Sequence, residues 1–354
     1  MSAIYYSQSY REAREKFLQA ASGLSQTACL LPGLRGPDGL PLYTDTAYLG
    51  PRDAARLLIV SSGLHGIEGY AGSAIQIHTL KHILQPPLPD NLAVLHVHAL
   101  NPYGFAHDLR TNADNIDLNR NFHDWTQGKP QDHKLAGAVH DILFDQSLMR
   151  RYVRAGAFLA RYGACTAQAA LTQGQFSNPQ GLFYGGQALT HEARIWRVLL
   201  DRYGANRSHI VHLDLHTGLG QRGHGEIIVA DGPDSAMFER AKDWWGPVTS
   251  LSDGSSVSAR VVGDICTSFN RAASATAHTL ATLEFGTVSG YKVVEALLAD
   301  NRARLQGRGS LQVARDKMRK VFYPQDVLWQ EKVLNRGQQV ISAALRGLQD
   351  IKPD

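Results

Sequence analysis

Cysteine is scarce in this sequence, and its placement excludes two kinds of site. The three cysteines, Cys29, Cys165 and Cys266, are far apart among 354 residues and form no CxxC or CxxH pair. A disulfide framework or a thiolate zinc site is therefore not expected. This cysteine usage is typical of a reducing compartment, and we expect a cytoplasmic protein.

Long apolar runs and clusters of one charge are also missing. No stretch approaches the roughly 20 apolar residues that span a bilayer, and the N-terminus lacks the pattern of a secretion signal. The 36 basic and 32 acidic side chains give a formal net charge of +4, without a run of Lys or Arg. We therefore expect neither a membrane nor a nucleic-acid partner. Nothing in the sequence defines an oligomeric state.

What the sequence does contain is an alternation of apolar runs and amphipathic stretches. The hydrophobic fraction of 44% is enough to bury a large core. Apolar runs predict strands at 56–61, 92–100, 208–215, 226–230 and 280–285, and helical periodicity predicts helices at 8–24, 69–83, 191–203, 234–245 and 291–305. Together they predict an α/β fold with an open mixed, mostly parallel sheet flanked by helices.

No repeat and no long flexible linker divides the chain. We therefore expect a single catalytic domain over residues 1–354, with two additions. One is a helical insert at about 130–190, which ends in a Gly-rich loop, and the other is a helical C-terminal tail at about 305–354. The segment 33–50 is rich in Gly, Pro, Asp and Tyr, which predicts turns and short strands.

The segment SSGLHGIEGY at 61–70 contains the first candidate metal ligands. His65 and Glu68 lie three residues apart between a predicted strand and a predicted helix, where both can reach one ion. Gly63, Gly66 and Gly69 permit a tight backbone there. On its own the segment fits equally well a surface histidine and a glutamate at a helix N-terminus.

A second segment, HIVHLDLHTGLG at 209–220, supplies a third candidate ligand. It is a predicted strand that ends near His216. In open α/β sheets, sites gather beyond the carboxyl ends of strands, so His65, Glu68 and His216 form a candidate set of the kind that catalytic zinc uses. Asp214 shares a strand face with His216 and either orients it or belongs to an unrelated hydrogen-bond network.

Two further segments supply candidate catalytic and substrate-binding residues. Glu284 lies in the otherwise apolar segment TLATLEFGT, where burying a carboxylate requires a partner or a task, although a solvent-facing edge position would also explain it. The polar segment HDLRTNADNIDLNRNF at 107–122 carries Arg110, Asn119 and Arg120. Arginine and asparagine donors can bind a carboxylate or an oxyanion, and the same segment also has the composition of a structural loop.

The order HGIE, NPYGF, IDLNRNF, DLHTG and LEFGT, over about residues 58–290, resembles the zinc carboxypeptidase superfamily, which includes aspartoacylase and succinylglutamate desuccinylase. Within it the chain is similar to an uncharacterised bacterial branch of carboxypeptidase-like proteins. The resemblance implies that His65, Glu68 and His216 bind Zn²⁺ and that Glu284 activates water. It also implies that Arg110 polarises the scissile carbonyl and that Asn119 and Arg120 bind a substrate carboxylate.

Two features depart from the digestive carboxypeptidases of that superfamily. Their mobile tyrosine, shortly before the catalytic glutamate, has no counterpart, since residues 232–283 contain no Tyr, and neither Tyr184 nor Tyr291 aligns with it. The insert at 130–190 also lacks an obvious counterpart, so substrate preference does not transfer.

These motifs predict a zinc-dependent hydrolase that cleaves a peptide or amide bond next to a free carboxylate, acting on a small peptide or an acyl amino acid. An N-acyl amino acid deacylase of the aspartoacylase type is the alternative within the same fold. From another class, the chain could be a non-catalytic peptide or amino-acid binding protein. The retention of Glu284 argues against that alternative, because a binding protein needs no general base.

Overall fold

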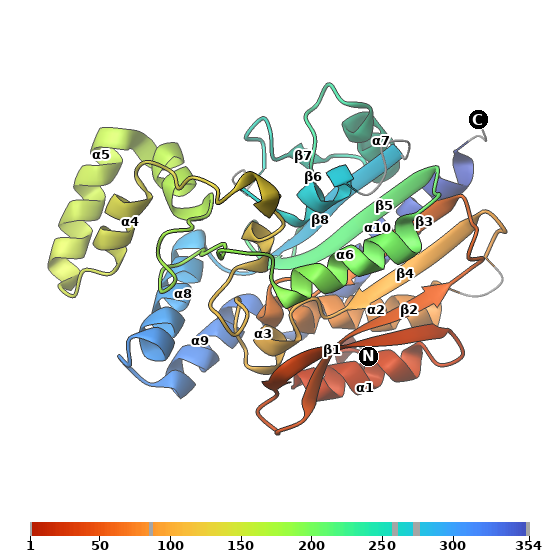
Figure 1. The fold of residues 1–354 in the computed structure, drawn as a ribbon, viewed down its shortest axis with the longest axis horizontal. Coiled ribbons are helices and arrows are strands. Elements are labelled where there is room, and N and C mark those ends of the chain that lie inside the picture. Colours follow the sequence, from red (N-terminus) through yellow and green to blue (C-terminus); the bar gives the residue numbers. More distant parts are fainter. Residues whose placement is uncertain (1, 85–87, 257–260, 272–276, 352–354) are drawn as a thin grey trace.

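In the computed structural model, which describes residues 2–84, 88–256, 261–271 and 277–351, one mixed sheet of eight strands organises the chain (Figure 1). The strand order is β1-β2-β4-β3-β5-β8-β6-β7. The strands are β1 (Ser25–Arg35), β2 (Pro41–Leu49), β3 (Arg56–Ser62), β4 (Leu92–His98), β5 (His209–Gly218), β6 (Gly225–Val229), β7 (Thr249–Ser250) and β8 (Ala277–Gly286). The four central strands, β4, β3, β5 and β8, are mutually parallel, which confirms the predicted fold class.

Helices cover both faces of this sheet. They are α1 (Tyr10–Ala20), α2 (Gly69–His82), α3 (Pro102–Ala106), α4 (Ala136–Leu143), α5 (Leu148–Thr172), α6 (His191–Gly204), α7 (Ala236–Trp245), α8 (Gly290–Leu305), α9 (Leu311–Phe322) and α10 (Val327–Asp350). Helix α10 packs so closely on α2 that a Cβ at Gly337 would lie 2.8 Å from Ile75. No helix in the described ranges is long and apolar enough to cross a membrane.

Alternation along the central strands divides the apolar residues between two cores. Leu57 and Ile59 of β3 face the core that contains Trp196 of α6. Leu58 and Val60 face the larger core, which contains residues of α1, α2 and α10. All seven residues of β3 are buried, as expected of a parallel strand covered by helices on each side.

Most predicted elements are present, and the differences lie at the edges of the fold. Strand β1 begins at Ser25, before the segment 33–50 in which turns and short strands were expected. This edge strand is mostly exposed and its pairing with β2 shifts register between Leu31 and Arg35, so it lacks a clear apolar alternation. The short helix α3 and the two-residue strand β7 were not predicted. The insert contains α4 and α5, and the tail contains α9 and α10.

A close backbone contact joins the HGIE segment at 65–68 to the NPYGF segment at 101–105. The turn η2 (Gly66–Glu68) lies against α3, and the main-chain N–H of Gly66 donates over 3.2 Å to the carbonyl of Arg110, in the loop after α3. A Cβ at Gly66 would lie 2.1 Å from the backbone carbon of Gly104. Only glycine permits this approach, which places His65 and Glu68 just beyond the carboxyl end of the central strand β3.

We expect Gly66→Ala to lower the free energy of unfolding by about 3 kcal/mol, because the added methyl group must displace the backbone of α3. The measurement is denaturant unfolding followed by circular dichroism. Gly156→Ala is the matched control, since this exposed glycine within α5 has nothing within 4 Å of the added Cβ. The control should be neutral or slightly stabilising. Equal stability of both variants would contradict the importance of the contact.

Candidate metal centre

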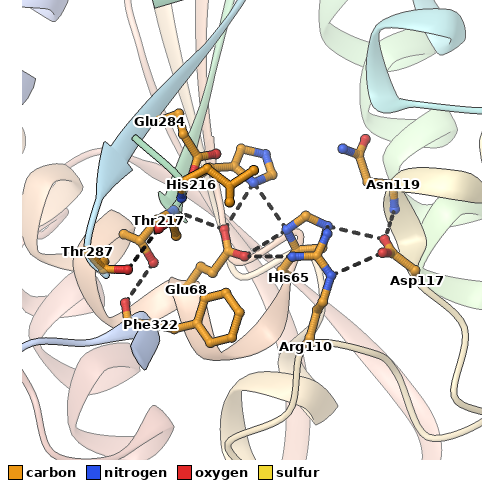
Figure 2. Close-up of polar contacts among 12 residues, drawn as sticks. His65, Glu68, Arg110, Asp117, Asn119, His216, Thr217, Glu284, Thr287 and Phe322 are labelled. Atoms are coloured by element: carbon orange, nitrogen blue, oxygen red, sulfur yellow. Dashed lines mark hydrogen bonds and ion pairs between the residues drawn. The ribbon is translucent and has the colours of Figure 1, made fainter. Parts of the chain in front are cut away.

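Three buried side chains converge where β3 and β5 end (Figure 2). His65 precedes the turn η2 after β3, Glu68 is the last residue of that turn, and His216 lies near the end of β5. Their exposed fractions are 3%, 2% and 4%. Among the described residues these three form the group of donor atoms that can hold a metal ion, as the sequence predicted.

The donor atoms face one another at hydrogen-bond distance. Nδ1 of His65 lies 3.2 Å from Nδ1 of His216, and the Glu68 oxygens lie 2.9 Å from the first nitrogen and 3.0 Å from the second. When both imidazoles carry their protons on Nε2, two nitrogen lone pairs and a carboxylate point at one small volume. Such an arrangement requires a positive charge at its centre, and two His and one carboxylate are a donor set that zinc accepts. The residues therefore fit a zinc ion.

The pKa values of the cluster express the same requirement. Burial would lower the pKa of His216, but the Asp214 and Glu68 carboxylates hold it well above its usual value. Burial would raise the pKa of Glu68, and the two imidazoles lower it. Without a metal, the protein thus favours a proton between the carboxylate and an imidazole, at the place that a cation would occupy.

A buried relay behind His216 fixes which nitrogen faces the cluster. Asp214 Oδ2 lies 2.5 Å from Nε2 of His216, so this nitrogen donates to Asp214. The other ring nitrogen, Nδ1, faces Glu68 and His65 (Figure 2). The Ser61 hydroxyl donates to Oδ1 of Asp214 over 2.6 Å and lies 2.7 Å from Nε2 of His212. Asp214 therefore orients His216, the first of the two roles considered for it.

Asp117 performs the same task for His65. Its Oδ1 lies 3.2 Å from Nε2 of His65, and its Oδ2 accepts from Nε of Arg110 over 3.1 Å. Burial would raise the pKa of Asp117, but Arg110 and then Arg120 hold it well below its usual value. Arg110 also donates to Glu68 over 3.1 Å. The predicted carbonyl-polarising arginine is thus adjacent to the cluster.

Glu284 reaches the same region from the middle of the sheet. Strand β8 lies between β5 and β6, which excludes the edge position. Glu284 pairs in register with His216, and its Oε1 accepts from the main-chain N–H of Leu219 over 2.9 Å. Burial, followed by the negative charge of Glu68, raises the pKa of Glu284 to about 7. A carboxyl with this pKa can exchange protons near neutral pH.

Asn119 and Arg120 line the same cavity, but their visible contacts are structural. The Asn119 side-chain oxygen accepts from the main-chain N–H of Ile265 over 3.0 Å. Nε of Arg120 donates over 3.0 Å to the carbonyl of Thr172, the last residue of α5, and Nη1 donates to the carbonyl of Asn119. Burial lowers the pKa of Arg120 to about 10.

Two residues of the site had no role in the sequence analysis. Asp117 stands inside the quoted IDLNRNF motif, and the need of each ligating histidine for an acceptor could have identified it. Ser61 was assigned no role, because its function depends on the register of β3 with β5, which pairs it with Asp214. Neither Tyr184 nor Tyr291 lines the cavity around the cluster.

We expect the purified protein to contain about one zinc per chain, and the double variant His65→Ala, His216→Ala to contain none. The measurement is metal content by mass spectrometry. The double variant His78→Ala, His82→Ala is the control, because it removes two histidines from α2 that contact Tyr5 instead of the cluster. Metal retained after loss of His65 and His216, in a protein with an unchanged circular dichroism spectrum, would place the site elsewhere.

We expect Ser61→Ala to weaken zinc binding about 10- to 100-fold, because Asp214 loses its hydroxyl donor and no longer holds His216 as firmly. The measurement is competition with a chromophoric chelator. Ser62→Ala is the adjacent control, since its hydroxyl donates to Gln76 instead. Equal zinc affinities for the two variants would show that the Ser61 hydroxyl does not contribute to zinc binding.

Several solved structures are similar to this chain. Carboxypeptidase A from Helicoverpa armigera has 15% identity and a TM-score of 0.48, over 95% of this chain and 74% of that one. A murein-tripeptide amidase from Escherichia coli O157 has 16% identity and a TM-score of 0.37, over 84% and 95%. Succinylglutamate desuccinylase from Chromobacterium violaceum has 14% identity and a TM-score of 0.39, over 91% and 76%. Similarity at this level carries no information on substrate.

Comparison of the sequence with family models identifies the family of this chain. No curated protein matches the sequence. The family model described as "Protein of unknown function (DUF2817)" matches residues 6–336, which is nearly the whole chain. The chain therefore belongs to the DUF2817 family.

Proposed function

We propose that this protein is a zinc-dependent hydrolase that cleaves a peptide or amide bond next to a free carboxylate. The observation that carries the proposal is the convergence of His65, Glu68 and His216 beside a carboxyl whose pKa is raised to about 7, Glu284. A purely structural metal site needs no fourth group that exchanges protons. All four side chains line one cavity of about 580 Å³, which has the size of a small-molecule site.

Zinc, when held by the three ligands, polarises a carbonyl and lowers the pKa of water. The protein's own residues then handle the proton. Glu284 is the general base: its carboxylate takes a proton from the attacking water and later gives it to the departing nitrogen. The main-chain N–H of Leu219 keeps this carboxylate oriented.

Arg110 is the proposed donor to the carbonyl oxygen. Its Nη2 lies 2.7 Å from Nε2 of His65, the nitrogen that also faces Asp117. A His65 ring that uses Nδ1 as a ligand carries its proton on Nε2, and two donors cannot share that contact. With Nδ1 of His65 as a ligand, its Nε2 proton would bond to Asp117, and Nη2 of Arg110 would be left to donate to substrate.

Asn119 and Arg120 are the proposed partners of the substrate carboxylate. Arg120 has five N–H donors, of which one on each of Nε, Nη1 and Nη2 bonds to the carbonyls of Thr172 and Asn119. Two N–H groups remain for a ligand. The contacts with the main chain hold the guanidinium in place, so that binding a carboxylate costs little side-chain entropy.

An N-acyl amino acid deacylase is the second candidate, and the apolar residues of α4, α5 and α8 that line the same cavity favour it. A non-catalytic binding protein would use the same ligands and the same cavity. The three functions differ in turnover: release of an amino acid from dipeptides, release from acyl amino acids, or no release of either by the zinc-loaded protein.

We expect Glu284→Gln to keep its zinc and to lose a factor of about 10² to 10⁴ in kcat, because an amide cannot accept the proton of water. The measurement is amino-acid release from blocked dipeptides and N-acyl amino acids by the zinc-loaded protein. Glu226→Gln is the matched control, since Glu226 pairs in register with Glu284 on β6 but does not line the cavity.

The control should hydrolyse the same substrates at the wild-type rate. Near-normal turnover by Glu284→Gln would contradict the assignment of the base. If the zinc-loaded wild type hydrolyses none of these substrates, the proposal of an enzyme is contradicted and the non-catalytic binding function is favoured.

A further inference from the structure

The cavity at the metal centre continues well beyond the reacting groups. Besides the metal ligands it is lined by residues of α4, α5 and α8. Helices α4 and α5 form the region predicted as a helical insert, and Figure 1 shows them at the left, next to α8 and apart from the sheet. The insert and α8 therefore form a wall of the cavity that the sheet itself does not provide.

This wall is mostly apolar, with Gln168 and Thr172 as the polar residues that α5 contributes to the lining. The side chains that it presents include Ile142 and Leu143 from α4, Phe158 and Leu159 from α5, and Val294 and Leu297 from α8. Among the polar lining residues, Arg120 lies next to the metal centre, because its Nη1 is 3.9 Å from Oδ2 of Asp117, whose Oδ1 lies 3.2 Å from Nε2 of His65. The cavity thus has a polar, reactive part and an aliphatic part.

The part of this wall that α5 provides is not the inside of a packed core, whereas Ile142 of α4 and Leu297 of α8 are only 7% and 5% exposed. Within α5, all of which the structure describes, Ala170 is the one fully buried residue, and Leu159 is 48% exposed although it lines the cavity. Apolar surface left in contact with water is unfavourable, and removing it from water is the driving force for an apolar ligand. This wall is therefore suited to an apolar group that enters from solvent.

The backbone of α5 is bent so that both of its parts face this cavity. At Gly163 the dihedral angles are φ 78° and ψ 163°, a conformation that is essentially restricted to glycine. Phe158 lines the cavity before the bend, and Ala167 and Leu171 line it after the bend. Thr172, at the end of the second part, accepts from Arg120, which ties the wall to the reacting groups.

We propose that the wall formed by α4, α5 and α8 binds the acyl chain of the substrate, and that the substrate class is N-acyl amino acids with a medium or long aliphatic acyl group. The reaction on this substrate rests on the proposed hydrolase function, whereas the binding of the acyl chain does not. The occupant is an acyl chain because the apolar wall and the metal ligands line one continuous cavity. A single ligand with an amide at the metal and an aliphatic tail fills both parts.

The reaction on such a substrate is a hydrolysis and needs only water. The water oxygen forms a bond to the acyl carbon, and the bond between that carbon and the nitrogen breaks. The nitrogen leaves with the electron pair of this bond and receives a proton from Glu284. The products are a fatty acid and a free amino acid, and no oxidant or reductant takes part.

The test measures binding to zinc-loaded Glu284→Gln by titration calorimetry, with N-decanoylglycine below its micelle concentration, N-acetylglycine and glycylphenylalanine. We expect N-decanoylglycine to bind about 100-fold more tightly than N-acetylglycine, which corresponds to moving about three to four of its additional methylenes out of water at roughly a factor of four each. Its binding should also show the negative heat-capacity change of apolar burial.

Two matched variants, each combined with Glu284→Gln, test whether the acyl chain of the ligand binds at this wall. Ala155→Phe, which narrows the cavity, should weaken N-decanoylglycine at least tenfold and leave N-acetylglycine unchanged. Ala160→Phe adds the same ring to an exposed position of α5 outside the cavity and should change neither. Equal affinity for the two acyl glycines, tighter binding of glycylphenylalanine, or equal effects of the two variants would overturn the proposal.

Failure of this inference and failure of the proposed reaction are distinguishable. Chain-length-dependent binding to Glu284→Gln, without hydrolysis by wild type, would support the acyl site and contradict the hydrolase. Hydrolysis by wild type without a dependence on chain length would support the hydrolase and contradict the acyl site.

Discussion

The constraint on which the site depends is electrostatic: two imidazole nitrogens and a carboxylate share a space that only a cation can make favourable. Their Nδ1 atoms lie 3.2 Å apart, and Asp117 and Asp214 hold the far nitrogens of the two rings. Each of these carboxylates is in turn held by an arginine or a serine. These contacts fix the orientation of both rings, so that holding a metal ion would cost little side-chain freedom.

The parallel strands explain how distant segments supply this cluster. Strands β3 and β5 are neighbours in register, and their carboxyl ends bring His65 and His216 together. Strand β8 pairs with β5 so that Glu284 lies level with His216. The position of these side chains therefore depends on the hydrogen-bond register of three strands, and a slip by one residue would turn the side chains of a strand to the opposite face.

The central strands and the convergence of the candidate ligands were predictable from the sequence because each leaves a local pattern. Buried parallel strands are continuous apolar runs, and HGIE follows one such run while DLHTG ends another. The edge strand β1 leaves no such pattern, since its side chains are mostly exposed. The relay through Ser61 depends on pairing between strands, and the anchoring of Arg120 by Thr172 joins residues 52 positions apart. Contacts of that kind do not appear in local patterns.

The insert has a consequence for how this protein can change over evolution. The sheet, with its registered strands and crowded glycines, tolerates little variation, as the closeness of Gly66 to Gly104 illustrates. Helices α4 and α5 lie outside that sheet, and most residues of α5 are not constrained by a packed core. Substitutions there can alter the shape of the cavity while the register behind the metal ligands stays intact. The chemistry and the choice of substrate can therefore be inherited separately.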